Sequence, residues 1–227
     1  GLLVVVLVST FVLSALGAYQ RDQQARAVMS TVNDARDIMT AKIVERGELA
    51  IANLALEVPD AAAPATVTQL QRLHAQSKSA LETVMRKIAQ HPDADARSRL
   101  AAMVDSVRRY RAILSGLDAA IQKPRQERDA NVSTDWKAVT GTLTRQLAAQ
   151  SEILGTDIAG IDPFVDRMMK INDSSWNMRS NAGNERGRMQ TMVIDNRVPE
   201  PALQWSAAEF KGRIDARWDD IQAEARR

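Results

Sequence analysis

The sequence predicts an all-α protein, an up-and-down antiparallel bundle of about six helices whose first helix is continuous with a transmembrane segment. Alanine, leucine, arginine, glutamine and aspartate dominate the 227 residues, and only 4% are aromatic, which favours helix over sheet. Apolar residues recur every three or four positions in long segments, and no stretch alternates as strands do. Short proline-containing segments separate the helical ones, so consecutive helices should be antiparallel neighbours.

The first eighteen residues carry no charge and are almost wholly apolar. A membrane-spanning helix needs about 20 such residues. We therefore expect residues 1–19 to be a transmembrane helix truncated at its N-terminus, followed by one extracytoplasmic domain over residues 20–227. The competing interpretation is a signal peptide with a cleavage region at residues 14–18. Against it, helical patterning continues past this point without a break rich in proline or glycine.

Prolines and turn residues divide the rest of the chain. The expected helices cover residues 19–58, 65–90, 94–122, 133–158, 163–197 and 202–227. The segment Ser133-Thr134-Asp135 is typical of a helix start, and residues 125–129 are expected to form a loop or a poorly ordered turn. Asp162 suits the N-cap of the fifth helix, because Pro163 follows it in the first helical turn.

Periodic apolar residues predict which helix faces are buried. The clearest example is the second helix, whose inner positions recur at three- and four-residue steps: Leu70, Leu73, Ser77, Leu81, Val84 and Ile88. Such a stripe requires neighbouring helices to cover it.

A repeated triplet, Glu-Arg-Gly, marks two equivalent-looking places. It occurs at residues 45–47 and again at 185–187, and a proline follows each arginine after 13 residues. The arginines, Arg46 and Arg186, would then lie roughly 20 Å below two helix ends, on helices that point the same way. We expect them at the same height and facing partly inward.

Six residues are the candidate ligand-binding set: Arg46, Arg186, Arg179, Trp176, Gly47 and Gly187. Guanidinium groups remain charged and offer paired donors that match the oxygens of nitrate, carboxylate or phosphate. A glycine inside a helix costs about 1 kcal/mol relative to alanine, so Gly47 and Gly187 suggest close backbone approach or room for a ligand. The alternative is that Glu45 or Glu185 forms an internal salt bridge with the arginine of the other helix.

The two triplets, with the run Ile51-Ala52-Asn53-Leu54 and the segment 182–187, resemble bacterial nitrate- and nitrite-sensing (NIT) domains. The resemblance implies an all-helical sensor in which Arg46 and Arg186 grip a small anion, nitrate, nitrite or a small carboxylate. The segment 176–179 is also similar to the sensing regions of chemoreceptors, sensor kinases and diguanylate cyclases. This implies a homodimeric receptor of the bacterial inner membrane, with residues 20–227 in the periplasm.

Other functions have little support in the sequence. The chain has no cysteine and two histidines, and it contains no nucleophile motif, phosphate loop or zinc spacing, so we expect neither a metal nor a cofactor and no enzyme activity in this fragment. A net charge of +2 and a small basic patch at residues 108–111 do not indicate nucleic-acid binding. The alternative from another class is a structural or interaction module that senses a partner protein without a small ligand.

Overall fold

The computed structural model describes residues 2–90, 94–158, 162–196, 198 and 201–226, without the side chains of residues 2–10, 12, 157–158 and 202–203. In this part of the chain the structure has six α-helices and one short 3-10 helix. They are α1 (Leu2–Glu57), α2 (Pro64–Ala89), α3 (Ala94–Ile121), η1 (Arg125–Glu127), α4 (Ala130–Ile158), α5 (Pro163–Ile194) and α6 (Pro201–Ala225). The prediction of an all-α chain with six helices is confirmed.

Most helix ends lie close to the predicted positions, and their causes are local. Asp162 is the N-cap of α5, as predicted: its Oδ1 accepts hydrogen bonds from the backbone N–H groups of Phe164 and Val165, at 2.9 and 3.0 Å. The predicted start of the fourth helix at Ser133 is wrong. Asp129 Oδ1 accepts from the backbone N–H of Asn131 at 2.9 Å, so α4 begins at Ala130.

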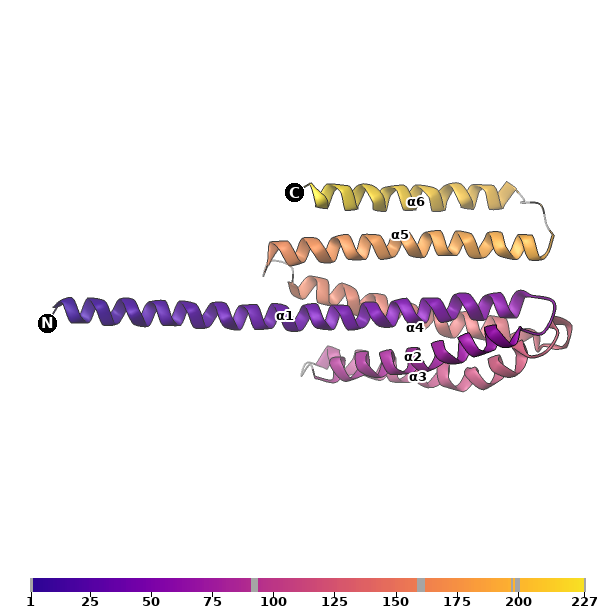
Figure 1. The fold of residues 1–227 in the computed structure, drawn as a ribbon, viewed down its shortest axis with the longest axis horizontal. Coiled ribbons are helices and arrows are strands. Elements are labelled where there is room, and N and C mark those ends of the chain that lie inside the picture. The colour runs from indigo at the N-terminus through magenta and orange to yellow at the C-terminus, as the bar shows by residue number, and fades with distance from the viewer. Residues whose placement is uncertain (1, 91–93, 159–161, 197, 199–200, 227) are drawn as a thin grey trace.

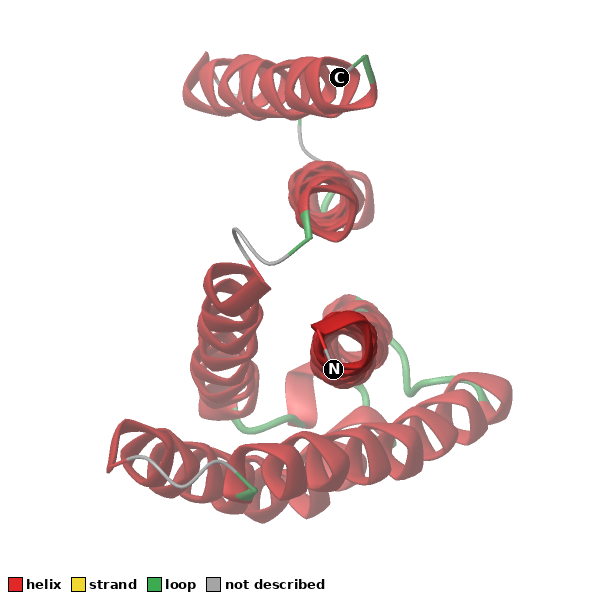
Figure 2. Ribbon diagram, turned by 90° about the vertical axis from the view of Figure 1, so that its left-hand side faces the viewer, coloured by secondary structure: helices red, strands yellow, loops and turns green. Residues whose placement is uncertain are grey.

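The helices run alternately in opposite directions, but they do not all share one core (Figure 1). Helices α1 to α4 pack around a common centre, each against its neighbours. Helices α5 and α6 form a hairpin beside this four-helix group, with α5 against α1 and α4 and α6 on the far side of α5 (Figure 2). The expected six-helix bundle is therefore a four-helix core with an attached helical hairpin.

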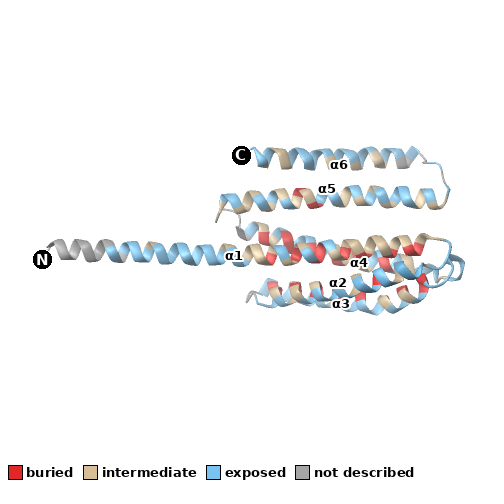
Figure 3. Ribbon diagram, in the orientation of Figure 1, coloured by how far each residue is buried: buried red, intermediate tan, exposed pale blue. Residues whose placement is uncertain are grey.

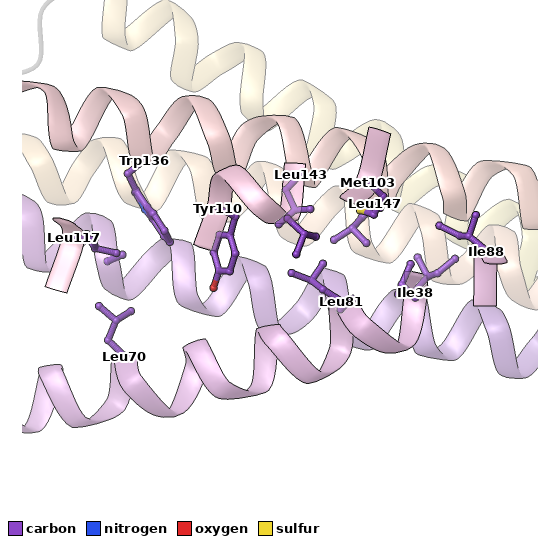
Figure 4. Packing of buried hydrophobic residues seen from close by; sticks show 14 of the residues in the cluster. Ile38, Leu70, Leu81, Ile88, Met103, Tyr110, Leu117, Trp136, Leu143 and Leu147 are labelled. Carbon is purple, nitrogen blue, oxygen red and sulfur yellow. The ribbon is translucent and has the colours of Figure 1, made fainter. Parts of the chain in front are cut away.

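The hydrophobic core lies within the four-helix group. Its buried members come from α1, α2, α3 and α4, and α5 adds the partly buried Met169 (Figure 3). Trp136 and Tyr110 lie side by side in this core with ring centroids 6.1 Å apart (Figure 4). In α2 the predicted stripe is buried except for Leu73, which is half-buried.

Residues 125–129 were expected to be a loop or a poorly ordered turn. They contain η1 and Arg128, whose side chain makes several hydrogen bonds to the backbone. The Arg128 guanidinium donates to the carbonyl oxygens of Ala55, Leu56, Asp60 and Lys123 at 2.6–3.0 Å. Charge-assisted bonds to the carbonyls at a helix C-terminus satisfy groups that have no partner inside the helix. Arg128 therefore ties the end of α1 to the two connections that surround it.

The N-terminal half of α1 projects well beyond the other helices, and α6 returns toward that same end of the molecule (Figure 1). No helix in the described part of the chain is long and apolar enough to span a membrane. The predicted transmembrane segment, residues 1–19, falls largely on side chains outside the described set.

Candidate anion-binding groove

A cavity of about 700 Å³ lies between α1 and α5, with one residue each from α4 and α6 at its edge. All six candidate residues line it: Arg46, Gly47, Trp176, Arg179, Arg186 and Gly187. Below, this space is called the groove. The repeated triplet therefore brings residues 140 positions apart into one site.

Arg46 crosses from α1 to α5. Its Nη2 donates to the backbone carbonyl oxygen of Ser180 at 3.1 Å and to the side-chain oxygen of Asn184. Gly183 lies between them: a Cβ at this position would be 3.3 Å from Arg46 Nη2. The guanidinium thus rests against one turn of α5, and the missing side chain of Gly183 makes room for it.

The relative heights of the arginines differ from the prediction. Arg46 contacts residues 134 and 138 positions later, at Ser180 and Asn184, and Glu57 contacts Thr191, again 134 positions later. The 140-residue offset of the triplets is therefore not the register of the helices. Arg179 and Arg186 lie on either side of the turn that Arg46 contacts, so the expectation of equal height for Arg46 and Arg186 is wrong.

The three arginines also differ in burial. Arg46 is half-buried and points inward as predicted, but Arg186 and Arg179 are exposed at the rim of the groove. Trp176 is 8% exposed and makes two cation–π contacts: Lys42 Nζ lies 5.0 Å and the Arg179 guanidinium 6.0 Å from its ring centroid. Trp176 therefore forms one end wall of the groove beside Arg179.

The two glycines of the triplets do not mark close backbone contacts. A Cβ at Gly187 would meet nothing within 4 Å, and one at Gly47 would make an ordinary contact with Leu73 at 3.8 Å. Gly187 thus leaves open space in the groove. The tight contact occurs at Gly183 instead, where the Arg46 side chain rather than the α1 backbone lies against the glycine.

The cations of the groove differ in their acidic partners: Lys137 pairs with Glu57, whereas three of the arginines have no such partner in the described residues. Among the described residues, no carboxylate forms an ion pair with Arg46, Arg179 or Arg186. Burial lowers the pKa of Arg46. The neighbouring Glu45 carboxylate opposes this effect, whereas the positive charges of Arg186 and Arg179 add to it. An arginine with a lowered pKa still remains protonated at neutral pH.

The internal salt bridges considered as an alternative are not seen in the described residues. Glu45 turns away from the groove and accepts a hydrogen bond from Thr144 of α4 at 2.8 Å. Burial raises the pKa of Glu45 to about 7, although the Thr144 hydrogen bond lowers it. Glu185 Oε2 is buried and has no hydrogen-bond partner in the described residues. Neither Glu45 nor Glu185 therefore forms a salt bridge with the arginine of the other helix in this part of the chain.

The end of the groove near the C-termini of α1 and α5 has further polar contacts. Glu57 accepts from Thr191 Oγ1 at 2.8 Å and lies 3.7 Å from Lys137 Nζ. On the α6 side, the Arg188 guanidinium stacks on Phe210, 4.8 Å from the ring centroid. This end is therefore closed by a carboxylate that already has a cationic partner.

The three residues that contact Arg46 on α5 were not predicted as site residues: Ser180, Gly183 and Asn184. Gly183 and Asn184 stand directly before the second triplet, and Ser180 and Asn184 lie one helical turn apart on α5. All three residues therefore lie within two helical turns of Arg186 in the sequence. What the sequence did not show is that the arginine of the other triplet reaches them.

A second polar cluster lies inside the four-helix group, away from the groove. Glu48 of α1, 1% exposed, accepts hydrogen bonds from Ser77 and Tyr110 and lies 2.7 Å from His74 Nδ1. The other ring nitrogen of His74 is 3.2 Å from Asp118 Oδ1. Burial lowers the pKa of His74, but hydrogen bonds to both carboxylates and their charges raise it above its usual value overall. The cluster joins α1, α2 and α3.

Comparisons of the chain with protein-family models, with curated proteins and with solved structures found no match.

Proposed function

We propose that this chain is the ligand-sensing part of a bacterial transmembrane signalling receptor, and that it binds a small anion in the groove between α1 and α5. The observation that carries the proposal is that four arginines from two different helices line one cavity, and that three of them, Arg46, Arg179 and Arg186, have no acidic ion-pair partner in the described residues. Uncompensated cations at a partly buried site favour an anionic ligand, because paired charge-assisted hydrogen bonds would satisfy them.

The arrangement also supports a route for the signal. A ligand held by Arg46 on α1 and by Arg179 or Arg186 on α5 contacts both helices at once. If the anion binds more tightly to one relative position of the two helices, it shifts the population toward that position. Because α1 is one uninterrupted helix from Leu2 to Glu57, a displacement at Arg46 would be carried along its whole length.

The proposal includes the cellular setting. Residues 1–19 would be part of a transmembrane helix in the bacterial inner membrane, and residues 20–227 would lie in the periplasm. The apolar composition of residues 1–18 and the return of α6 toward the end from which α1 projects support this (Figure 1). A homodimer paired along α1 is proposed from the resemblance to receptor sensor domains.

The test is a titration of the 227-residue chain in detergent micelles with nitrate, nitrite and acetate, following the melting temperature. A ligand that binds the folded state raises it by mass action. We expect a saturable rise that is lost in the double variant R46A/R186A and retained in R108A, whose arginine is exposed in α3 away from the groove. Equal shifts in wild type and the double variant, or no shift with any anion, would refute the proposed site.

A further inference from the structure

A second cavity, of about 220 Å³, lies inside the four-helix core, and α1, α2, α3 and α4 all contribute to its wall. Four of its apolar lining residues are buried: Ile38, Val84, Ile88 and Leu154. Ile38 and Ile88 lie at the end of the core away from Leu70 and Leu117 (Figure 4). None of the residues that line this cavity lines the groove between α1 and α5, so the two sites are distinct.

The lining of this core cavity also contains charged groups of both signs. Asp34 and Asp95 supply two carboxylates, and Lys87 and Arg99 supply two cations, so the lining has no net charge at neutral pH. Lys87 Nζ lies 2.7 Å from Asp34 Oδ1. A lysine ammonium has three N–H donors, so Lys87 keeps donors beyond this ion pair. Asp95 is exposed at the start of α3 and forms no ion pair among the described residues.

Gln150 of α4 is the observation that points to a ligand. It is 8% exposed and lines the cavity, yet its side-chain amide makes no hydrogen bond in the described part of the chain. Buried amides are normally hydrogen-bonded, because an amide that leaves water without a new partner is unfavourable. A partner inside the cavity would supply the missing bonds. Because buried apolar residues surround the same space, a partner with apolar surface fits it better than water alone.

We propose that the core cavity binds a small aliphatic amino acid, such as valine or leucine, as a zwitterion. Its volume of about 220 Å³ is several times the roughly 30 Å³ share of one water and lies below the roughly 300 Å³ at which pockets for drug-sized ligands begin. The ligand's ammonium group would pair with Asp95, and its carboxylate would accept hydrogen bonds from Lys87 and the Gln150 amide. Its side chain would pack against the buried apolar residues. A zwitterion also adds no net charge to a lining that has none.

Calorimetric titration of the 227-residue chain in detergent micelles tests this site. The probes are L-leucine and L-valine, glycine as the amino acid without a side chain, and isopentylamine and isocaproate as aliphatic probes with a single charge. We expect leucine or valine to bind at least about tenfold more tightly than each of the other three. Equal affinity for isopentylamine or isocaproate would overturn the zwitterion, and equal affinity for glycine would overturn the apolar part of the site.

The variant Gln150→Leu separates a role in binding from a role in folding. The amide makes no hydrogen bond among the described residues, so an apolar side chain of similar size should not lower the melting temperature. The affinity for free leucine should nevertheless fall at least about tenfold, and Asp95→Asn should weaken it similarly. Asp135→Asn removes an exposed carboxylate near the start of α4 and is the control that should keep wild-type affinity.

The outcome is independent of anion binding in the groove, so Arg46→Ala should bind free leucine as wild type does. Wild-type affinity in either Gln150→Leu or Asp95→Asn would overturn the proposed contacts. Absence of binding by every amino acid tested would overturn the site as a whole.

Discussion

Arg46 of α1 donates through Nη2 to the backbone carbonyl oxygen of Ser180 on α5, 3.1 Å away. A half-buried arginine usually pairs with a carboxylate, but this one uses neutral oxygens of the neighbouring helix and keeps its charge uncompensated. The contact joins the four-helix core to the outer hairpin. It also holds the guanidinium where a ligand can reach its remaining N–H donors.

The substitution Gly183→Ala tests whether the position of Arg46 matters for binding. The new Cβ would lie 3.3 Å from Arg46 Nη2, so the guanidinium must shift. We expect nitrate affinity to fall about three- to tenfold, equivalent to about 0.7–1.4 kcal/mol. Stability should not fall, because alanine is favoured over glycine in a helix by up to about 1 kcal/mol. Calorimetry and thermal melting measure the two effects separately.

Gly116→Ala in α3 is the matched control, since a Cβ there meets nothing within 4 Å and lies away from the groove. It should raise the melting temperature without changing anion affinity. Wild-type affinity in Gly183→Ala would show that the exact place of the Arg46 guanidinium is unimportant for binding.

Removing the carboxylate of Glu48 should strongly destabilise the four-helix core. Glu48→Ala leaves Ser77, Tyr110 and His74 without their shared partner in a buried site. Loss of one member of a buried charged network typically costs about 3–5 kcal/mol. Urea denaturation followed by circular dichroism measures the change, with Glu82→Ala as the control: Glu82 forms a surface pair with Arg111 at 2.8 Å, worth at most about 1 kcal/mol. A similar decrease in the free energy of unfolding in the two variants would show that the Glu48 cluster does not stabilise the core more than a surface ion pair does.

Stability should decrease as pH rises from about 5 to 8. Burial raises the pKa of Glu45 from 4.5 to about 7, so the folded state binds this proton more tightly than the unfolded state, and the stabilisation is lost as Glu45 ionises. The pKa of His74 is raised above 6.5, so its contribution is present below 6.5 and is lost as pH rises through the higher folded-state value. Both groups therefore act in the same direction.

The variant Glu45→Gln isolates one of these contributions. It should gain about 2–3 kcal/mol relative to wild type between pH 5 and pH 8, given about 1.4 kcal/mol per pKa unit. Urea denaturation midpoints at several pH values measure the slope. The control Glu82→Gln removes a carboxylate exposed at the surface and should keep the wild-type slope. A Glu45→Gln curve parallel to that of wild type would show that Glu45 does not titrate in this range.

The sequence predicted the elements of this fold better than their assembly. Helix existence follows from local periodicity and prolines, and the Asp162 cap follows from a short motif, so these were predictable from neighbouring residues. The register between α1 and α5 was not, because it depends on which turn of α5 the Arg46 side chain reaches. Repetition of Glu-Arg-Gly suggested an equivalence that the packing does not have: α1 lies in the core, and α5 lies outside it.

Arg128 should contribute more to stability than its loop position suggests. Arg128→Ala removes hydrogen bonds to four carbonyl oxygens around the end of α1. At about 1 kcal/mol for each bond with partial compensation by water, we expect a loss of about 2–4 kcal/mol in urea denaturation. Arg108→Ala is the control, because Arg108 is exposed and its contact with Asp105 is long, at 3.6 Å. A loss below about 1 kcal/mol for Arg128→Ala would mean that water replaces these bonds without cost.

The outer hairpin should open more readily than the four-helix core, and ligand should reduce the difference. The buried core cluster draws its members from α1 to α4, and only α5 of the hairpin adds a partly buried residue, Met169. Local opening is easiest where few apolar contacts must break, so backbone amides of α5 and α6 should exchange with deuterium at least about tenfold faster than those of residues 38–56. Mass spectrometry of peptic fragments measures this directly.

Saturating nitrate should slow exchange in α5 around residues 176–187, because a bridging anion adds contacts between α5 and α1 that opening must break. The same addition to Arg46→Ala should leave exchange in α5 unchanged, since the α1 end of the bridge is then missing. Equal protection of the hairpin and the core without ligand would contradict the loose attachment of α5 and α6. Protection by anion in Arg46→Ala would place the binding contacts on α5 alone and would remove the proposed coupling to α1.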